Sequence, residues 1–435
     1  VLALLKTSDS TVCELAGQTI SNAWGFPWET RQLPTPMPMP MPTPMPMPMM
    51  HGRFRAPRVR VHVHPGGRRR RNDAATLGAF RAVLRDDNRC VRNIAARVLS
   101  RARSPESYEA FIALLRDASP GLRETGALGL GELDDRRALG PLQGALRDRD
   151  ASVRAMAARG LGEVADSSSI GPLAKALADE AAPVRRAAAW ALGEGQSSKA
   201  LAPLTQALRD RSPEVREVAA WALGQLESGN AVPALGEALK DPSPGVRRAA
   251  AWALGQAEGA DAIELLLSSL GDRDPEVRLA AVYALGQIAS PRAVRGLGAL
   301  IRDESLDVKR AAIWALGVIE DGSALDALAA GLKDPDSETR QLAAWALGRL
   351  EDKAAVDPLV AALTDREPEV RVAAAWALGQ LESPRAVEPL KAALSDQSRE
   401  VHDAAQWAID QIQPEDDSRP LVRPRPRVRV KQRIE

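Results

Sequence analysis

Apolar residues recur with the period of an α-helix along most of this chain. A typical stretch, residues 241–270, reads DPSPGVRRAAAWALGQAEGADAIELLLSSL. Its apolar side chains at i, i+4, i+7 and i+8 share one helical face, namely Val246, Ala250, Ala253 and Leu254. Ser243 suits the N-cap position, and Pro244 suits the first turn, where a missing N–H leaves no hydrogen bond unmade. A second helix, ending in the ELLLSSL type of segment, follows a short polar break, so the pattern predicts a helical hairpin.

The same pattern returns every 31 residues. An aspartate marks each copy: Asp86, Asp117, Asp148, Asp179, Asp210, Asp241, Asp272, Asp303, Asp334, Asp365 and Asp396. Six positions later comes a basic residue or, in the last copy, a histidine: Arg92, Arg123, Arg154, Arg185, Arg216, Arg247, Arg278, Lys309, Arg340, Arg371 and His402. Eleven copies without an insertion or deletion indicate a solenoid, in which each hairpin is buried by its neighbours.

The D-x5-R and AAxALG patterns of residues 75–413 resemble the HEAT-repeat family, specifically the short bacterial kind related to phycobilin-lyase repeats. The resemblance implies an all-α fold, a right-handed α-solenoid of about eleven 31-residue helical hairpins. It also implies that the aspartates and basic residues form an internal ladder between consecutive repeats, which is a structural role. The first two copies and the last diverge, as capping repeats do. Arg97 and Ser100 replace the aromatic and the glycine, and Asp410 replaces the glycine at the far end.

One position of the first helix is aromatic in eight consecutive copies: Trp190, Trp221, Trp252, Tyr283, Trp314, Trp345, Trp376 and Trp407. This position lies about 130° from the centre of the buried face, so we expect it at the flank or on the exposed, concave side. The residue four positions later lies beside it on the helix surface: Glu194, Gln225, Gln256, Gln287, Val318, Arg349, Gln380 and Gln411. We name these two sets together the Trp/Gln stripe.

The Trp/Gln stripe predicts a surface that binds a protein or an extended peptide. It resembles the concave groove of armadillo-type nuclear import receptors, where amides bond a peptide backbone and tryptophans form slots for its side chains. That resemblance implies these contact residues: Trp190, Trp221, Trp252, Tyr283, Trp314, Trp345, Trp376, Gln225, Gln256, Gln287 and Gln380. In the alternative interpretation, the tryptophans only cover alanine-rich helix surfaces and stack on their counterparts in the next copy.

Charge is distributed unevenly, although the whole chain carries only +1. Residues 51–71 hold eight arginines and no acid, and residues 418–435 hold seven basic side chains and one acid. With −1 on residues 1–50, these arms leave a net charge of −12 on residues 72–417. An acidic body favours basic or apolar partner segments and disfavours nucleic acid, whose phosphates require Lys and Arg.

Four further segments flank the repeats: an N-terminal segment of unknown fold (1–33), an extended Pro/Met linker (34–50) and two basic arms (51–74 and 414–435). Residues 34–48 read PTPMPMPMPTPMPMP, and proline at every second position predicts a polyproline-like spacer. A Pro/Met linker followed by HEAT repeats resembles the extracytoplasmic tails of some bacterial membrane metallopeptidases, which implies a cell-envelope or extracellular location. Their zinc motif is absent here. No apolar run reaches the roughly 18–20 residues that span a bilayer, so we expect no membrane span.

Each basic arm contains a stretch in which valine alternates with arginine or histidine. These stretches are PRVRVHVH at 57–64 and PRVRVKQRI at 426–434, and their period of two predicts strands. A single strand is not stable alone, and the ends of such a solenoid lie about 100 Å apart, so these strands would pair between molecules. The valines expected in this assembly are Val59, Val61, Val63, Val428 and Val430. The alternative is two disordered basic tails.

Two functions follow from these patterns. The first is a non-enzymatic scaffold that holds a partner on the Trp/Gln stripe, and the alternative is a self-assembling filament subunit joined head to tail through its arms. No HExxH or CxxC motif occurs, and no cluster of acid, base and nucleophile stands apart from the repeat. His62 and His64 supply only two metal ligands, so we expect no enzymatic activity, no cofactor and no metal site.

Overall fold

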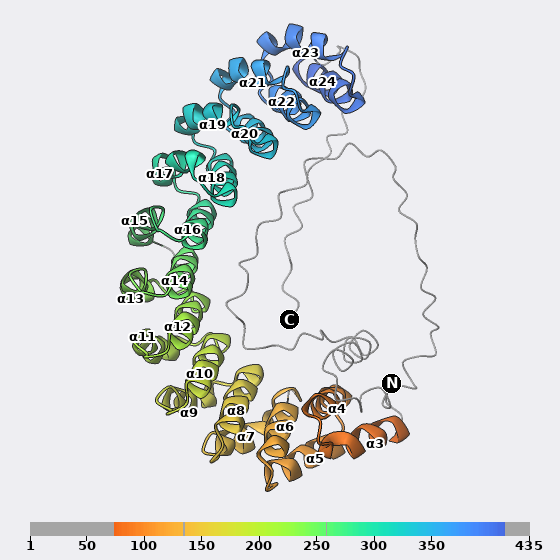
Figure 1. The fold of residues 1–435 in the computed structure, drawn as a ribbon, viewed down its shortest axis with the longest axis vertical. Coiled ribbons are helices and arrows are strands. Elements are labelled where there is room, and N and C mark those ends of the chain that lie inside the picture. Colours follow the sequence, from red (N-terminus) through yellow and green to blue (C-terminus); the bar gives the residue numbers. More distant parts are fainter. Residues whose placement is uncertain (1–73, 134, 258, 414–435) are drawn as a thin grey trace. The chain divides into compact units, whose positions relative to one another are not determined.

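The computed structural model describes residues 74–133, 135–257 and 259–413. These residues fold into α-helices joined by short turns and 3-10 helices, and no strand occurs among them. The chain divides into two compact units, unit 1 ending at Gly296 and unit 2 starting at Leu297. Within each unit the helices stack as hairpins (Figure 1), which confirms the prediction of an all-α solenoid.

The first helices of the repeats form one row in each unit and lie on its concave side (Figure 1). In unit 1 they are α4 (Arg89–Ala102), α6 (Pro120–Gly131), α8 (Ala151–Val164), α10 (Ala182–Glu194), α12 (Pro213–Gln225), α14 (Pro244–Gln256) and α16 (Pro275–Ile288). In unit 2 they are α18 (Leu306–Ile319), α20 (Ser337–Arg349), α22 (Pro368–Gln380) and α24 (Arg399–Ile412). Neighbouring first helices within a unit pack directly on one another, so they form a continuous inner surface.

The second helices form the outer row. In unit 1 they are α5 (Pro105–Leu115), α7 (Leu139–Ala145), α9 (Ile170–Ala176), α11 (Leu201–Ala207), α13 (Val232–Ala238) and α15 (Ala260–Ser269), with α3 (Ala74–Ala82) and η2 (Val83–Arg85) ahead of the first repeat. Helix α17 (Val294–Ala299) lies at the unit boundary and is followed by η8 (Leu300–Arg302). Unit 2 contains α19 (Leu325–Gly331), α21 (Val356–Ala362) and α23 (Val387–Ala393).

Most second helices are shorter than the repeat pattern predicts, because their first turn is a separate 3-10 helix. These turns are η3 (Arg136–Ala138), η4 (Ser167–Ser169), η5 (Ser198–Ala200), η6 (Gly229–Ala231), η7 (Pro291–Ala293), η9 (Gly322–Ala324), η10 (Lys353–Ala355) and η11 (Pro384–Ala386). Asp352 shows how such a turn starts, since its carboxylate accepts a 2.9 Å hydrogen bond from the Ala354 N–H. An aspartate that caps a turn in this way competes with α-helical bonding and favours the tighter helix.

Helix α14 shows how the predicted first helix forms. Ser243 occupies the N-cap with extended backbone angles, and Pro244 is the first helical residue, as predicted. The Ser243 side chain makes no capping hydrogen bond. The backbone N–H of Ser243 donates instead to Asp241 Oδ1 at 2.8 Å. The four predicted core residues of this helix are fully buried: Val246, Ala250, Ala253 and Leu254.

The basic residues and aspartates form the ladder that the family resemblance implied. Arg247 donates from Nε and Nη2 to the two carboxylate oxygens of Asp272 in the next repeat, at 2.7 and 2.8 Å. Its Nη1 donates to the carbonyls of Asp241 and Pro242, which close the turn of its own repeat. The same bidentate bonding to the following aspartate occurs at Arg123, Arg154, Arg185, Arg216, Arg340 and Arg371. The ladder residues are therefore structural.

The glycine of the AAxALG pattern sets the distance between neighbouring first helices. A Cβ built on Gly193 would lie 2.8 Å from Cβ of Ala222 and 3.1 Å from Cζ3 of Trp221, both on the next first helix. Gly131 faces Gly160 still more closely. Because no side chain intervenes, the helix backbones approach each other and bury the alanines between them.

The divergent copies have a structural explanation. Ser100, in place of the glycine, is buried and its hydroxyl lies within hydrogen-bonding distance of the carbonyls of Ala96 and Gly129, at 2.9 and 2.8 Å. At the other end, Asp410 is exposed and accepts a 2.8 Å hydrogen bond from Gln406. The first substitution fits between two helices, whereas the second gives the last helix a polar outer face.

Candidate partner-binding surface

The aromatic position of the Trp/Gln stripe lies on the first helices, which form the inner row of each unit (Figure 1). Seven of its eight side chains are half-buried: Trp221, Trp252, Tyr283, Trp314, Trp345, Trp376 and Trp407. This intermediate burial agrees with a position at the flank of the buried face. Trp190 is different, with only 5% of its surface exposed, so it offers almost no area to a partner and we leave it out of the candidate surface.

Several indoles pack on the glycine of the preceding repeat. A Cβ on Gly224 would lie 2.6 Å from Cζ3 of Trp252, and one on Gly317 would lie 2.7 Å from Cζ3 of Trp345. The edge of each six-membered ring therefore occupies the space that a side chain would fill. The tryptophans are packing residues on this edge, and only the remainder of each ring is available to a ligand.

Two rings of the row stack on each other. Trp376 and Trp407 have ring centroids 6.4 Å apart and planes inclined by 8°. This pair forms a local apolar strip on the inner surface of unit 2. A strip of this kind can accept aliphatic side chains or the flat faces of other aromatic or guanidinium groups.

The amides of the Trp/Gln stripe are accessible. Gln287 and Gln380 are exposed, and Gln225 and Gln256 are half-buried. Gln256 donates from Nε2 to Oε1 of Gln287 in the next repeat at 3.2 Å. Each of these two amides keeps further donors or acceptors for a ligand backbone. One departure from the pattern, Arg349, forms an ion pair with Glu320 instead.

In the first and third repeats the same row is ionic, whereas the second repeat has the buried Leu128 at the aromatic position. Arg97 forms a 3.2 Å ion pair with Glu132, and Arg159 lies 3.8 Å from Glu163. Burial raises the pKa of Glu132 from its usual value, although the neighbouring Arg97 opposes this effect. The signal in the sequence was the replacement of tryptophan by arginine at positions 97 and 159. The inner surface of unit 1 thus changes from charged to aromatic along its length.

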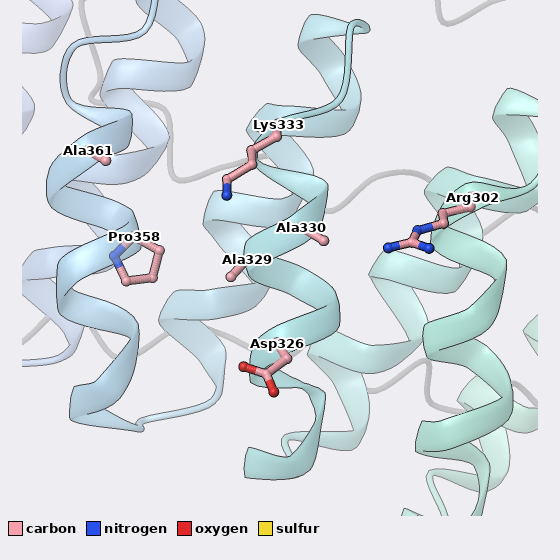
Figure 2. A pocket seen from close by; sticks show the side chains of 7 residues that line it. All are labelled: Arg302, Asp326, Ala329, Ala330, Lys333, Pro358 and Ala361. Carbon is pink, nitrogen blue, oxygen red and sulfur yellow. The ribbon is translucent and has the colours of Figure 1, made fainter.

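A depression of about 640 Å³ lies on the outer row of unit 2 (Figure 2). It is lined by Arg302, Asp326, Ala329, Ala330, Lys333, Pro358 and Ala361, from η8, α19, α21 and the turn after α19. The small alanines leave the space between the helices open, while Arg302 and Lys333 reach over it (Figure 2). None of the predicted contact residues lines this depression.

Other sequence predictions concern residues that the structure does not describe. The assembly residues Val59, Val61, Val63, Val428 and Val430, and both predicted strands, lie outside the described residues. So do His62, His64 and the Pro/Met linker. Within residues 74–413, apart from positions 134 and 258, we find no helix with the length and apolar composition needed to cross a membrane. The same residues contain no group of three or more potential metal ligands.

Comparison with known proteins identifies the repeat. The family model described as HEAT repeats matches residues 77–152, 140–212, 201–274, 263–337 and 325–410. No curated protein matches the chain in sequence.

Solved structures share the fold at low sequence identity. Yeast importin-β (Kap95p) is similar with a TM-score of 0.55 and 16% identity, over 77% of this chain and 57% of that one. A structure of Kap95p described as binding RanGDP gives a TM-score of 0.53 and 16% identity, over 78% of this chain and 56% of that one. An engineered protein matches with a TM-score of 0.40 and 22% identity, over 77% of this chain and 98% of that one.

Proposed function

Because this chain belongs to the HEAT-repeat family, we propose that it is a non-catalytic scaffold that binds an extended polypeptide along the Trp/Gln stripe. The observation that carries the proposal is the recurrence of a half-buried aromatic ring and a neighbouring amide on consecutive first helices. Neighbouring packed helices are roughly 10 Å apart, and a polyproline II chain returns to the same face after about 9 Å. A polypeptide in this conformation would therefore offer one equivalent residue to each repeat.

The charge of the body sets the preferred ligand. Residues 72–417 carry −12, so the potential around the inner surface favours ligand segments with basic or apolar side chains. Such side chains also suit the exposed parts of the indole rings, through apolar contact or cation–π attraction. Nucleic acid is disfavoured because its phosphates require a basic surface.

The similar solved structures are compatible with this proposal. Kap95p, whose fold this chain shares over 78% of its length, is described as binding RanGDP, a protein ligand. HEAT solenoids hold proteins on extended surfaces built from successive repeats. The proposal extends this general property to the chain through its own Trp/Gln stripe.

A peptide selection tests the proposed surface. Phage-displayed random peptides are selected on the immobilised full chain, and the enriched peptides are synthesised and titrated. The test variant replaces two exposed amides of the stripe, Gln287→Ala with Gln380→Ala. One amide lies in each unit, so the variant removes a hydrogen bond to the ligand in whichever unit a selected peptide occupies, and peptide binding should weaken by about fivefold. These amides are preferable to the tryptophans as targets, because removing an indole also leaves a cavity above a glycine.

The matched control replaces two exposed glutamines outside the stripe, Gln206→Ala on α11 with Gln397→Ala in the turn before α24. This control should bind the peptides as the unaltered chain does, and circular dichroism should show unchanged helix content in both variants. Equal binding by the test and control variants, or no enriched peptide at all, would contradict the proposal.

A filament subunit is the second candidate, and the alternation of valine with arginine at residues 57–64 and 426–434 favours it. Assembly of this kind would depend on the arms, since the outer face of α24 is polar. Light scattering of the full chain, compared with a chain lacking residues 51–71 and 418–435, tests it. Particles that form only with the arms present would support a filament, and monomers in both samples would exclude it.

A further inference from the structure

A pocket of about 220 Å³ lies on the inner row of unit 1, next to the start of the aromatic part of the Trp/Gln stripe. Its lining includes Arg89, Glu124, Ala155, Arg159 and Arg186, from α4, α6, α8 and α10. Arg186 precedes the buried Trp190 by one helical turn, so the pocket marks the transition between the ionic and aromatic parts of this surface. None of the sequence-predicted contact residues lines it.

Arg186 lacks the ion pair that arginines make at the equivalent position of other repeats. Arg248 forms a 3.2 Å ion pair with Glu217, which lies 31 residues earlier in the preceding repeat. Arg310 pairs with Asp336 at 2.9 Å and also with Glu338. For Arg186 the residue 31 positions earlier is Ala155, and no carboxylate oxygen of the described residues lies within 4.0 Å of its guanidinium.

The guanidinium is also partly shielded from water. Arg186 is half-buried, and its Nε is fully buried without a hydrogen-bond partner in the described part of the chain. A buried charged donor without a partner is unfavourable, so such groups bond to water, a counter-ion or a ligand. The small side chain of Ala155 leaves open the space that a carboxylate fills beside Arg248.

Nearby carboxylates compensate the three arginines of this site to different degrees. Arg89 is paired with Glu124, and Arg159 has Glu163 at 3.8 Å, so these cations are partly compensated. Glu214 is the acid on the following first helix that corresponds to Glu338, but its carboxylate bonds to the Ser212 hydroxyl instead. The bond from Ser212 and, as a smaller effect, the charge of Arg186 lower the pKa of Glu214, so this acid lies near Arg186 without a direct ion pair. Arg186 is thus the one arginine of the pocket without a direct ion pair among the described residues.

We propose that this pocket binds a carboxylate of the partner polypeptide, with Arg186 as its bidentate donor and Arg159 as a second cation. The chemistry follows from the equivalent positions, where the groups that face the arginine are carboxylates. The inference rests on the proposed function for the identity of the ligand as a polypeptide. It gives that ligand a direction, since an acidic residue lies at the pocket and the basic or apolar residues follow along the aromatic part of the stripe.

Two variants of the full chain test the pocket by different means. Arg186→Gln removes the charge, and Ala155→Glu supplies an internal carboxylate in the place that Glu217 holds relative to Arg248. The matched control is Arg248→Gln, which alters an equivalent arginine that is already paired. Without any ligand, Ala155→Glu should raise the melting temperature and Arg186→Gln should leave it unchanged or higher. Arg248→Gln should lower the melting temperature, because Glu217 loses its counter-ion.

The probe is a fluorescein-labelled hexapeptide with two central glutamates flanked by glycine and serine. It is titrated at about 0.15 M ionic strength, where the repulsion from distant acidic side chains is screened and the contact with the partly buried Arg186 is screened much less. The same peptide with glutamines in place of the glutamates serves as the neutral control. Arg186→Gln and Ala155→Glu should each weaken binding of the acidic peptide by about tenfold, whereas Arg248→Gln should bind it as the unaltered chain does. The glutamine peptide should bind the unaltered chain and all variants with the same affinity.

Equal affinity of Arg186→Gln, Ala155→Glu and the unaltered chain for the acidic peptide would overturn the inference, as would the absence of any preference for glutamate over glutamine. The variant with Gln287→Ala and Gln380→Ala separates this inference from the proposed function. Neither amide lines the pocket, so that variant should keep its affinity for the acidic hexapeptide even if it loses the peptides selected from the library.

Discussion

At the scale of single residues, the glycine of an AAxALG segment and the tryptophan of the next repeat belong to one packing unit in several repeats. Gly224 shows this clearly, because a Cβ at this position would meet Trp252 Cζ3 at 2.6 Å and the Ala253 backbone at 2.9 Å. The contact partners are an indole ring and a helix backbone, neither of which can move aside easily. The conformational freedom of glycine is therefore not the reason for its presence here; the reason is its size.

The substitution Gly224→Ala should lower the free energy of unfolding by about 1–3 kcal/mol, since the added methyl group overpacks the contact between α12 and α14. The matched control is Gly144→Ala in α7, where a Cβ would meet nothing within 4 Å. There alanine should be neutral or stabilise the helix by up to about 1 kcal/mol. Urea unfolding followed by circular dichroism measures both variants, and similar midpoints for the two would contradict this packing account.

At the scale of the helical elements, the Arg/Asp ladder ties each repeat to the next. Arg340 bonds both oxygens of Asp365 and the carbonyls of Asp334 and Pro335, whereas Lys309 makes a single 2.6 Å bond to Asp334. A guanidinium has the planar set of donors that this bidentate geometry requires, and an ammonium group does not. The chain thus contains both a complete and a reduced version of the same connection.

Replacing Arg340 with lysine and Lys309 with arginine should change the free energy of unfolding in opposite directions. Arg340→Lys loses the bonds to the turn carbonyls and should destabilise the fold by about 1–3 kcal/mol, because those carbonyls remain partly buried. Lys309→Arg should stabilise it by about 1 kcal/mol. Thermal unfolding of both single variants and of the double variant measures the effects. A loss of stability on Lys309→Arg would show that the local backbone cannot accept the guanidinium.

The Arg/Asp ladder also predicts that the fold loses stability at low pH. Hydrogen bonds from Arg123, Arg340 and Arg371 lower the pKa of Asp148, Asp365 and Asp396 below the ordinary value of 3.8. A carboxyl group whose pKa is lower in the folded state takes up protons first in the unfolded chain. Its stabilising contribution is therefore complete above the ordinary value and declines as the pH falls through the folded-state value.

The melting temperature should accordingly fall as the pH is lowered below about 4, with little contribution from these aspartates above that point. Asp365→Asn should remove part of this acid dependence and should lower stability at neutral pH, because Arg340 loses its charged partner. A pH series of thermal melts on both chains provides the comparison. An unchanged pH profile in the variant would mean that other carboxyl groups dominate acid unfolding.

At the scale of the whole molecule, the last repeat differs from the others on one side of its first helix, the side that points away from the preceding repeat. His402, Gln406 and Asp410 are exposed on α24, where preceding repeats place arginine, alanine and glycine, for example Arg371, Ala375 and Gly379. The inner repeats bury those positions against the next first helix, and α24 has no such successor in the described residues. The last repeat of a solenoid needs a polar side in this place, because an apolar one would lower solubility.

Restoring the inner-repeat residues with His402→Arg, Gln406→Ala and Asp410→Gly should expose a face complementary to other first helices. The triple variant should then self-associate with increasing concentration, because an apolar face of helical packing type is left open. Analytical ultracentrifugation over a range of concentrations measures this against the unaltered chain. A triple variant as monomeric as the unaltered chain would show that these polar residues do not limit stacking.

The repeat, the hairpins and the core positions of α14 follow from the sequence by itself, whereas the ladder was implied by the family resemblance. The first three depend on residue type and spacing within one or two copies, and helical geometry converts that spacing into faces and contacts. The polar character of the last repeat was visible in the same way, because Asp410 occupies a glycine position. The division of the second helices into a 3-10 turn and a short α-helix was not predicted, since it depends on local capping bonds such as that of Asp352.

The distances between neighbouring helices decided the rest. They determine that Trp190 is buried while Trp221 remains half-buried, although both occupy the same place in the repeat. They also determine that Glu217 pairs with Arg248 and that Arg186 has only the small Ala155 at the corresponding place. A repeat pattern assigns the same environment to all copies, whereas burial and ion pairing depend on which side chains of adjacent copies compete for one space. That competition is a property of the stacked structure alone.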